Sequence, residues 1–348
     1  MSKRLPEDDL DFVLSLTSDF WTQFRGARIF LTGASGFIGS WLLELILHAN
    51  KTLGCDIHVT ALSRDRLRAQ QLLPHLFNDD AVQLVAGDMT TLSLPDSPID
   101  LCIHAAADVA DASKTAEHRR VFESAMLGTM HVLDLAERAG ARRFLLTSSG
   151  AVYGLQPPAM RGMSESYAGA PDTLDVLSAY GQGKRAAEWL VAERSNRGNM
   201  RVGIARIFAL IGPRLPLDGR FAVGNFIRDA LEGRQITIHG DGTPIRSYLY
   251  IADVCVWLLR MMTHNAASFA CNVGSEEQVS INELAELVRE VSGSVPKIAR
   301  QRTSNSSVLA HRYVPDTNLA RRELDLKIFT PLRLALSKTI NWHRMHNA

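Results

Sequence analysis

The sequence is poor in the features that mark several classes of protein. Its 348 residues include only four cysteines and no CxxC pair, which predicts reduced, buried thiols in a cytoplasmic protein. No apolar run approaches the roughly 20 residues of a membrane span, and the N-terminus lacks the apolar core of a signal peptide. The formal net charge of +1 argues against a nucleic-acid binder, because phosphate binding requires a basic surface.

Motifs for metal and hydrolytic chemistry are also missing. The eleven histidines form no HExxH pair and no cluster with cysteine at metal-ligand spacing, so no metal site is predicted. The sequence contains neither a GxSxG elbow nor a Walker loop. His104, at the end of an expected strand, is predicted to be a packed or cofactor-adjacent residue.

Strand and helix patterns alternate through the first two thirds of the chain. The expected strands cover residues 27–32, 57–63, 82–86, 101–105, 143–147 and 202–207, and the expected helices cover residues 36–48, 67–77, 121–139 and 179–194. Such alternation predicts βαβ units and a doubly wound parallel sheet, the Rossmann-type α/β fold. After Gly212 the regular alternation of strands and helices ends. The sequence there predicts a smaller C-terminal α/β lobe, with short segments at 235–239 and 246–250 and helices near 221–232, 254–262 and 281–291.

A glycine-rich segment, TGASGFIG, joins the first expected strand to the helix that follows it. Gly33, Gly36 and Gly39 occur at a GxxGxxG spacing. The first glycine permits a tight turn, the second lets the backbone approach a pyrophosphate, and the third allows close contact between helix and strand. Because the helix N-terminus offers N–H groups to phosphates, we predict a dinucleotide-binding domain over residues 26–211, preceded by a helical extension at residues 1–25.

The end of the second strand bears on the choice of dinucleotide. In NAD-binding units an acidic side chain there holds the ribose 2′-hydroxyl, but this sequence has Ser63 and Arg64. An arginine can pair with the 2′-phosphate of NADP; the alternative is a solvated loop cation. Asp88, next to Met89 after the third strand, is expected near the adenine. The small residues 105–107 would let a cofactor lie against the end of the fourth strand.

Tyr180 and Lys184 form the expected catalytic pair, because a spacing of four places both on one helix face. A phenol has a pKa near 10, and an adjacent ammonium stabilises the phenolate. Gly181 and Gly183 each cost roughly 1 kcal/mol relative to alanine in a helix. Their presence predicts that the backbone lies close to something bulky, such as a dinucleotide or another helix. Ser149, at the end of a strand, would hydrogen-bond the reacting oxygen of a substrate.

Several segments together resemble the extended short-chain dehydrogenase/reductase family, the nucleotide-sugar epimerases and dehydratases. These segments are TGASGFIG, HAAA, LTSSGAVYG, YGQGK and GDGTPIRSYLYIADV, and they occur in the family's order. The resemblance implies a nucleotide-sugar substrate bound mainly by residues 212–348, and a homodimer formed through the helices at 121–139 and 179–194.

The resemblance also implies the role of each site residue. Ser149, Tyr180 and Lys184 would be catalytic. The substrate would contact Ser149, Tyr153, Asn225 and Arg246. The expected cofactor-binding residues are Gly33, Ser35, Gly36, Phe37, Ile38, Gly39, Ser63, Arg64, Asp88, Met89, Ala105, Ala106, Ala107, Tyr180 and Lys184.

The sequence departs from the family pattern in ways that narrow the reaction. Family dehydratases carry an acid pair after the strand that ends at Ser149, and decarboxylases often carry a glutamate there, but this chain has Gly150 and Ala151. Family asparagines are replaced by Ala125 and Ala209. We therefore predict an epimerase that transiently oxidises a sugar hydroxyl, at C4, with hydride transfer to NAD(P). The alternatives are an NADPH-dependent reductase of 4-keto sugars, and a non-catalytic dinucleotide sensor.

Overall fold

The computed structural model describes residues 3–93, 97–107, 115–198, 200–217, 221–293, 297–301 and 311–346. The chain divides into two compact units. The first contains residues 1–154, 170–207 and 255–271, and the second contains residues 155–169, 208–254 and 272–348. This division differs from the expected boundary after residue 211, because the chain leaves the first unit and later returns to it.

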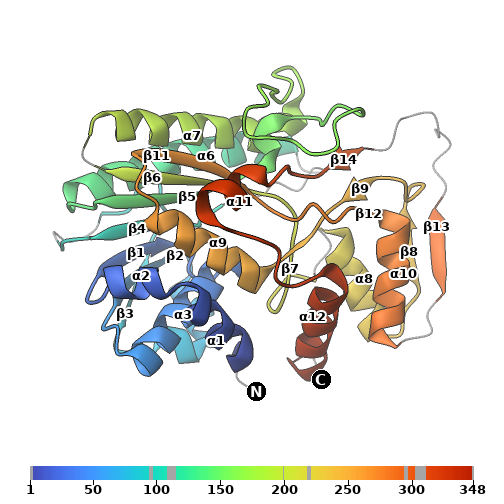
Figure 1. Ribbon diagram of the computed structural model, residues 1–348, viewed down its shortest axis with the longest axis horizontal. Coiled ribbons are helices and arrows are strands. Elements are labelled where there is room, and N and C mark those ends of the chain that lie inside the picture. Colours follow the sequence, from blue (N-terminus) through green and yellow to red (C-terminus); the bar gives the residue numbers. More distant parts are fainter. Residues whose placement is uncertain are drawn as a thin grey trace. The chain divides into compact units, whose positions relative to one another are not determined.

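The first unit is built on one seven-stranded sheet in the order β11-β6-β5-β4-β1-β2-β3 (Figure 1). All adjacent pairs from β6 to β3 are parallel. The strands are β1 (Arg28–Thr32), β2 (His58–Ser63), β3 (Val82–Ala86), β4 (Leu101–His104), β5 (Arg143–Ser149), β6 (Arg201–Ile207) and β11 (Ser268–Val273). The predicted doubly wound fold is confirmed, and β11 explains why residues 255–271 belong to this unit.

Helices cover both faces of this sheet. Its helices are α1 (Glu7–Leu16), α2 (Ser18–Gln23), α3 (Phe37–Leu53), α4 (Arg66–Leu72), α5 (Pro74–Phe77), α6 (Thr115–Arg138), α7 (Ala179–Asn196) and most of α9 (Ile251–Thr263), with short 3₁₀ turns η1 (Gly150–Tyr153) and η2 (Val176–Ser178). Figure 1 shows α6 and α7 together on one side of the sheet and α3 on the other, as right-handed crossovers require.

The core beneath α6 and α7 encloses the central strands of the sheet. Every residue of β5 is buried, as is typical of a parallel strand covered on both faces. The buried cluster includes Phe30, Cys102, Val132, Ala136, Phe144, Leu146, Ala187, Val191, Val202 and Ile204. Burying one large aliphatic or aromatic side chain contributes about 1.5–3 kcal/mol, so this cluster fixes the sheet that positions the site.

Two expected elements differ in the structure. The single helix expected at residues 67–77 is divided into α4 and α5, because Pro74 lacks an N–H group and disfavours a helical Leu73 before it. The N-terminal extension forms α1 and α2 and packs within the first unit. The backbone N–H of Leu5 donates to Glu44 of α3 at 3.0 Å, and Asp11 contacts His48 of α3 at 2.6 Å.

The described residues of the second unit form short strands and helices. Its strands are β7 (Leu210–Ile211), β8 (Ile236–His239), β9 (Ile245–Arg246), β10 (Leu249–Tyr250), β12 (Val279–Ser280), β13 (Ile298–Gln301) and β14 (Arg312–Tyr313). Its helices are α8 (Ala222–Leu231), α10 (Ile281–Ser292), α11 (Asn318–Leu324) and α12 (Leu332–His346). The segment expected at 246–250 is divided between β9 and β10. A Ser280–Glu283 capping box starts α10.

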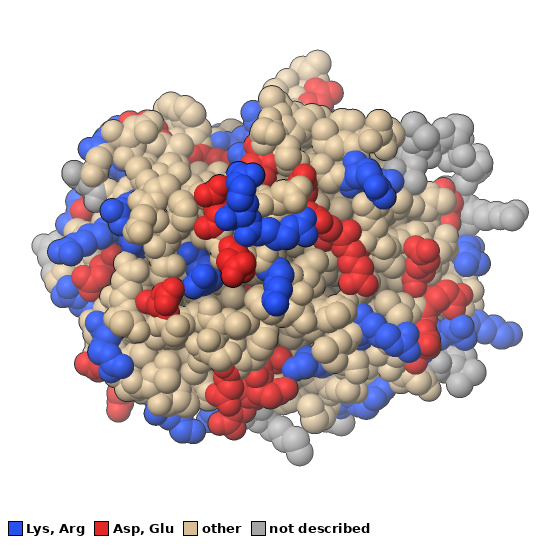
Figure 2. All heavy atoms as spheres, in the orientation of Figure 1, with Lys and Arg blue, Asp and Glu red and all other residues tan. Residues whose placement is uncertain are grey.

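The surface and the thiols agree with the composition. Acidic and basic side chains are interspersed on the face drawn in Figure 2, as expected for a net charge of +1. All four cysteines, Cys55, Cys102, Cys255 and Cys271, are buried free thiols. Among the described residues, no helix combines the length and apolar character needed to cross a bilayer, and no group of side chains could hold a metal ion.

Candidate active site

The glycine loop after β1 is folded tightly on itself. Gly33 has a φ of +70°, and a Cβ there would lie 2.7 Å from the backbone of Ala105 and Ala106 after β4. A Cβ on Gly39 would lie 2.1 Å from the Gly33 carbonyl oxygen. The first turn of α3 therefore touches the turn that leaves β1, and only glycine fits at either contact.

The N-terminus of α3 is open to an anion. Its N-cap residue is Gly36, no side chain caps the helix, and the first turn contains no acid. The first N–H groups of a helix need partners and attract negative charge. Ser35 and Gly36 are exposed, and Phe37 and Ile38 are half-buried in the turn that follows. This uncapped terminus fits a cofactor pyrophosphate.

The residues expected at the adenosine end lie at the ends of β2 and β3. The Ser63 hydroxyl is 3.4 Å from that of Ser35. Thr90 donates two hydrogen bonds to Asp88, and these hydrogen bonds, with a smaller effect of the positive charges on Arg64 and Arg120, lower the pKa of Asp88. Arg64 is exposed and lies within electrostatic reach of Asp88.

The Met89 side chain is buried against α6 at Gly128, where a Cβ would approach it to 2.9 Å. Ala105, Ala106 and Ala107 follow β4 and leave the turn partly open.

His104 is held in one neutral form by a chain of hydrogen bonds. Its Nδ1 is 2.7 Å from the Thr32 hydroxyl, and its Nε2 is 3.2 Å from the Thr129 hydroxyl. Since the Thr129 hydroxyl donates to the carbonyl oxygen of Ala125, it accepts from His104, which places the proton on Nε2. The Thr32 hydroxyl donates to Nδ1 and accepts from the Ala106 N–H. The network fixes the ends of β1 and β4 around the glycine loop.

Burial, together with the nearby charge of Lys184, lowers the pKa of His104 to about 3. Between pH 6.5 and 3 the unfolded chain therefore binds a proton that the folded chain does not, so stability falls as the pH falls. We expect this residue to remove about 2 kcal/mol of unfolding free energy between pH 7 and pH 5. Urea unfolding of the wild type and of His104→Asn at both pH values measures this loss of unfolding free energy. Equal pH dependence in the two proteins would contradict the neutral assignment.

Ser149, Tyr180 and Lys184 meet at the carboxyl end of β5. Ser149 is the last residue of the strand, and its hydroxyl accepts the Ala151 N–H at 3.2 Å as the chain turns into η1. Tyr180 is the second residue of α7 and is hydrogen-bonded to Ser149. Lys184, one turn later, is buried, donates to the Thr147 carbonyl oxygen at 2.8 Å, and lies 6.0 Å from the centre of the Tyr180 ring.

The charges of this trio depend mainly on burial. Burial raises the pKa of Tyr180, and the hydrogen bond with Ser149 only partly offsets it. Burial lowers the pKa of Lys184 to about 8, although the negative charge of Glu188 acts in the opposite direction. The phenol is thus protonated at pH 7, so the lowering of its pKa expected from the adjacent ammonium is not observed, whereas the Lys184 ammonium titrates close to physiological pH.

A buried ion-pair network lies behind the trio, and the sequence motifs did not identify it. Glu188, one turn after Lys184, accepts hydrogen bonds from Arg206 of β6 at 2.8–3.1 Å and from the Ser148 hydroxyl at 2.5 Å. Arg206 also donates to the Tyr153 hydroxyl at 2.9 Å. The spacing of four residues after Lys184 is the only sequence signal for Glu188.

Glu188→Gln should therefore affect both stability and pH dependence. Removing one partner of a buried ion pair leaves a buried charge and costs about 3 kcal/mol. Since Glu188 raises the pKa of Lys184, its loss should also move the alkaline limb of the rate profile to lower pH. Chemical unfolding and a kcat–pH profile measure the two effects. Glu193→Gln, on the same helix in an exposed pair with Arg197, should change stability by less than about 0.5 kcal/mol.

The structure places the remaining expected substrate residues as follows. Tyr153 is buried, with its ring 4.9 Å from the Arg206 guanidinium. Asn225 is half-buried in the first turns of α8, and Arg246 ends β9, where it donates to the carbonyl oxygens of Ile245 and His311 at 2.9 Å. Asn225 and Arg246 belong to the second unit, whereas Tyr153 and the catalytic trio belong to the first unit, which also contains the glycine loop.

Known proteins share this architecture. A family model described as the NAD dependent epimerase/dehydratase family matches residues 29–274. UDP-glucuronic acid decarboxylase 6 of Arabidopsis thaliana is 31% identical over 89% of this chain and 86% of its own length. The corresponding decarboxylase 1 of Xenopus tropicalis is 29% identical over 91% and 72%. The structure of MoeE5 with UDP-glucose and NAD is 28% identical, with a TM-score of 0.76 over 92% of this chain and 100% of that one.

The doubly wound sheet, the glycine loop and the serine–tyrosine–lysine trio define a nicotinamide-dependent enzyme. The chain belongs to the NAD-dependent epimerase/dehydratase family. The resemblance inferred from the sequence motifs is confirmed, and NAD is the cofactor of this family.

Proposed function

We propose that this protein is a nucleotide-sugar epimerase that transiently oxidises a sugar hydroxyl, at C4. The observation that carries the proposal is the hydrogen-bonded pair of Tyr180 and Ser149, with Lys184 one turn away at the same end of β5. The turn that follows Ser149 contains Gly150 and Ala151, so no acid stands there to drive loss of water or carboxylate. Reversible oxidation at one carbon needs only proton transfer and a hydride acceptor.

The proposed roles follow from the contacts of the trio. Bound NAD supplies a hydride acceptor that can also return the hydride. Tyr180 exchanges a proton with the sugar hydroxyl, and Ser149 orients that oxygen by hydrogen bonding. Lys184 keeps a positive charge near the phenol and favours its ionised form at the moment of transfer. The Lys184–Thr147 hydrogen bond holds the helix against the strand while this happens.

NAD rather than NADP is the cofactor we propose for turnover. Arg64, the expected partner for a 2′-phosphate, lies within electrostatic reach of Asp88, whose carboxylate offsets its charge. A self-contained epimerase also retains its cofactor, whereas the alternative reductase of 4-keto sugars must exchange NADPH. The nucleotide held after purification separates the two.

The substrate side and the assembly belong to the same proposal. We place Arg246 and Asn225 at the nucleotide and pyrophosphate of the substrate, as the family resemblance implies.

We also propose a homodimer through α6 and α7, because Leu127, Met130 and Trp189 are exposed apolar side chains on these two helices. A cytoplasmic location is supported by the four free thiols.

A second candidate is decarboxylation of a nucleotide-linked uronic acid, because the curated relatives at 29–31% identity are UDP-glucuronic acid decarboxylases. One assay separates the candidates. The protein is incubated with UDP-glucose or UDP-glucuronic acid and NAD, and products are followed by ¹H NMR together with trapping of CO₂. The expected result is a C4 epimer without CO₂. Release of CO₂ with formation of a pentose nucleotide would replace the proposal with the second candidate.

A further inference from the structure

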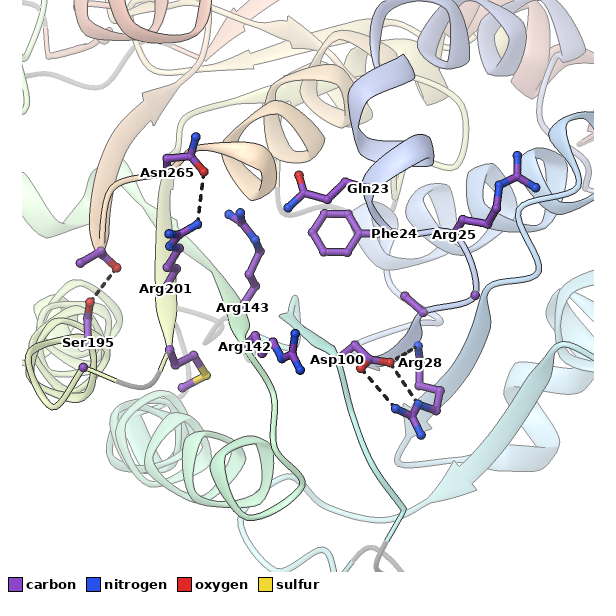
Figure 3. A pocket seen from close by; sticks show the side chains of 15 residues that line it. Gln23, Phe24, Arg25, Arg28, Asp100, Arg142, Arg143, Ser195, Arg201 and Asn265 are labelled. Carbon is purple, nitrogen blue, oxygen red and sulfur yellow. Dashed lines mark hydrogen bonds and ion pairs between the residues drawn. The ribbon is translucent and has the colours of Figure 1, made fainter.

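An open hollow of about 770 Å³ lies at the opposite edge of the sheet from the trio (Figure 3). Arg28, Arg143 and Arg201, the first residues of β1, β5 and β6, line it. It is closed on one side by Gln23 and Phe24 at the end of α2, and all of its lining residues belong to the first unit. Since β5 has seven residues, this edge is about 20 Å from Ser149.

The lining is strongly basic although the chain as a whole is nearly neutral. Five arginines and one aspartate contribute to it. Asp100 is already engaged by Arg28, which donates from its backbone N–H and from two guanidinium nitrogens at 2.9–3.2 Å. Arg25 points away from the hollow in Figure 3, toward the carbonyl oxygens of Leu53 and Gly54.

Arg142, Arg143 and Arg201 remain, and among them only Arg142 lies within electrostatic reach of Asp100, which Arg28 already engages. Arg143 is buried and donates to the His264 carbonyl oxygen at 2.8 Å, and Arg201 donates to the Asn265 amide oxygen at 3.2 Å. Within the described part of the chain, neither these two nor Arg142 forms an ion pair with a carboxylate. Burial and the neighbouring charge of Arg201 lower the pKa of Arg143.

This arrangement contrasts with other arginines of the same chain. Arg194 is paired with two acids on α6, Arg206 with Glu188, and Arg333 with Glu290. A desolvated cation close to a like charge is unfavourable, and an anion between them relieves both costs. Figure 3 shows Arg143 and Arg201 side by side with Arg142 nearby, which suits an oxyanion that needs several donors at once.

We propose that this hollow is a binding site for a small, multiply charged oxyanion, of the class that carries a diphosphate group. The volume is within the range of small-molecule sites. The lining favours phosphate over a nucleobase, because Phe24 is only 8% exposed and the Arg143 guanidinium lies 5.8 Å from the centre of its ring. The site is separate from the dinucleotide site, since parallel α/β sheets bind cofactors at the carboxyl ends of their strands.

Isothermal titration calorimetry with inorganic pyrophosphate tests the proposal on the 348-residue chain saturated with NAD, so that the glycine loop is filled. Saturable binding that weakens as salt is added is expected. The exposed double variant Arg142→Gln/Arg201→Gln should weaken this binding about tenfold or more, because each substitution removes a charged donor. Circular dichroism and NADH binding should stay unchanged in the variant.

Two controls locate the site. Arg119→Gln removes one exposed charge on α6 and should leave pyrophosphate binding intact. Arg246→Gln tests the proposed substrate site; loss of binding in that variant alone would overturn the assignment to the hollow. Binding that is absent, or equal in the double variant and the wild type, would also overturn it. Citrate serves as the carboxylate comparison, and tighter binding of citrate than of pyrophosphate would refute the diphosphate class.

Discussion

Tyr180→Phe should reduce kcat by about 10³-fold, because positioned acid–base groups contribute 10²–10⁴-fold and this substitution removes only the hydroxyl. The ring keeps its place at the start of α7, so folding and NADH binding should change little. Turnover of the substrate identified by the NMR assay, measured together with NADH fluorescence titration, gives both quantities. The expected pattern is lost kcat with retained cofactor affinity.

Ser149→Ala provides the companion measurement. It leaves Tyr180 in place and removes its hydrogen-bond partner, so kcat should fall by about 10²-fold. A Tyr180→Phe protein that keeps a tenth of wild-type turnover would show that another group transfers the proton. Absence of turnover in the wild type itself, with normal NADH binding, would favour the non-catalytic dinucleotide sensor.

The second large effect is expected for Gly39→Ala, a change of one methyl group. Its Cβ would lie 2.1 Å from the Gly33 carbonyl oxygen, so β1 and α3 must separate or the glycine loop must change shape. Forcing a methyl group into a packed site lowers the free energy of unfolding by about 1–3 kcal/mol. Because the Gly33 backbone is rigid, we expect a loss at or above the upper end of that range. NADH affinity should fall at least tenfold, because the α3 N-terminus moves with the loop.

Gly203→Ala in β6 is a matched control for that substitution. Its Cβ would meet the flexible end of Leu145 at 3.0 Å, which can adjust, so stability should change by less than about 1 kcal/mol and NADH binding should not change. Thermal unfolding and NADH titration of the two variants make the comparison. Similar behaviour of both proteins would mean that the close contact at Gly39 is relieved easily.

Much of the site was predictable because its signals are local in sequence. The glycine spacing predicts the loop, and the four-residue interval between Tyr180 and Lys184 predicts a shared helix face. The unfavourable helix propensity of Gly181 and Gly183 also correctly predicted that the backbone of this helix has close neighbours. A Cβ on Gly183 would lie 2.9 Å from the Ala125 Cβ of α6, and one on Gly181 would lie 2.6 Å from the Ala151 carbonyl oxygen. The close neighbours are therefore another helix and the η1 turn.

Other features depend on contacts between distant segments, which motifs do not encode. The Glu188–Arg206 pair joins α7 to β6. No local sequence pattern predicts that Glu188 will pair with an arginine eighteen residues away. The return of β11 to the sheet shifted the unit boundaries for the same reason. The basic hollow gathers Arg28, Arg143 and Arg201 from β1, β5 and β6, which are far apart in the sequence and come together only in the folded sheet.

The burial of all four thiols makes their alkylation a measure of local unfolding. Because Cys55, Cys102, Cys255 and Cys271 are each fully enclosed, a bulky alkylating reagent should modify the folded chain only when a segment opens. Mass spectrometry after timed alkylation then measures the modified fraction and identifies the thiol that reacts first. All four thiols belong to the first unit, so the order of labelling shows which part of that unit opens first.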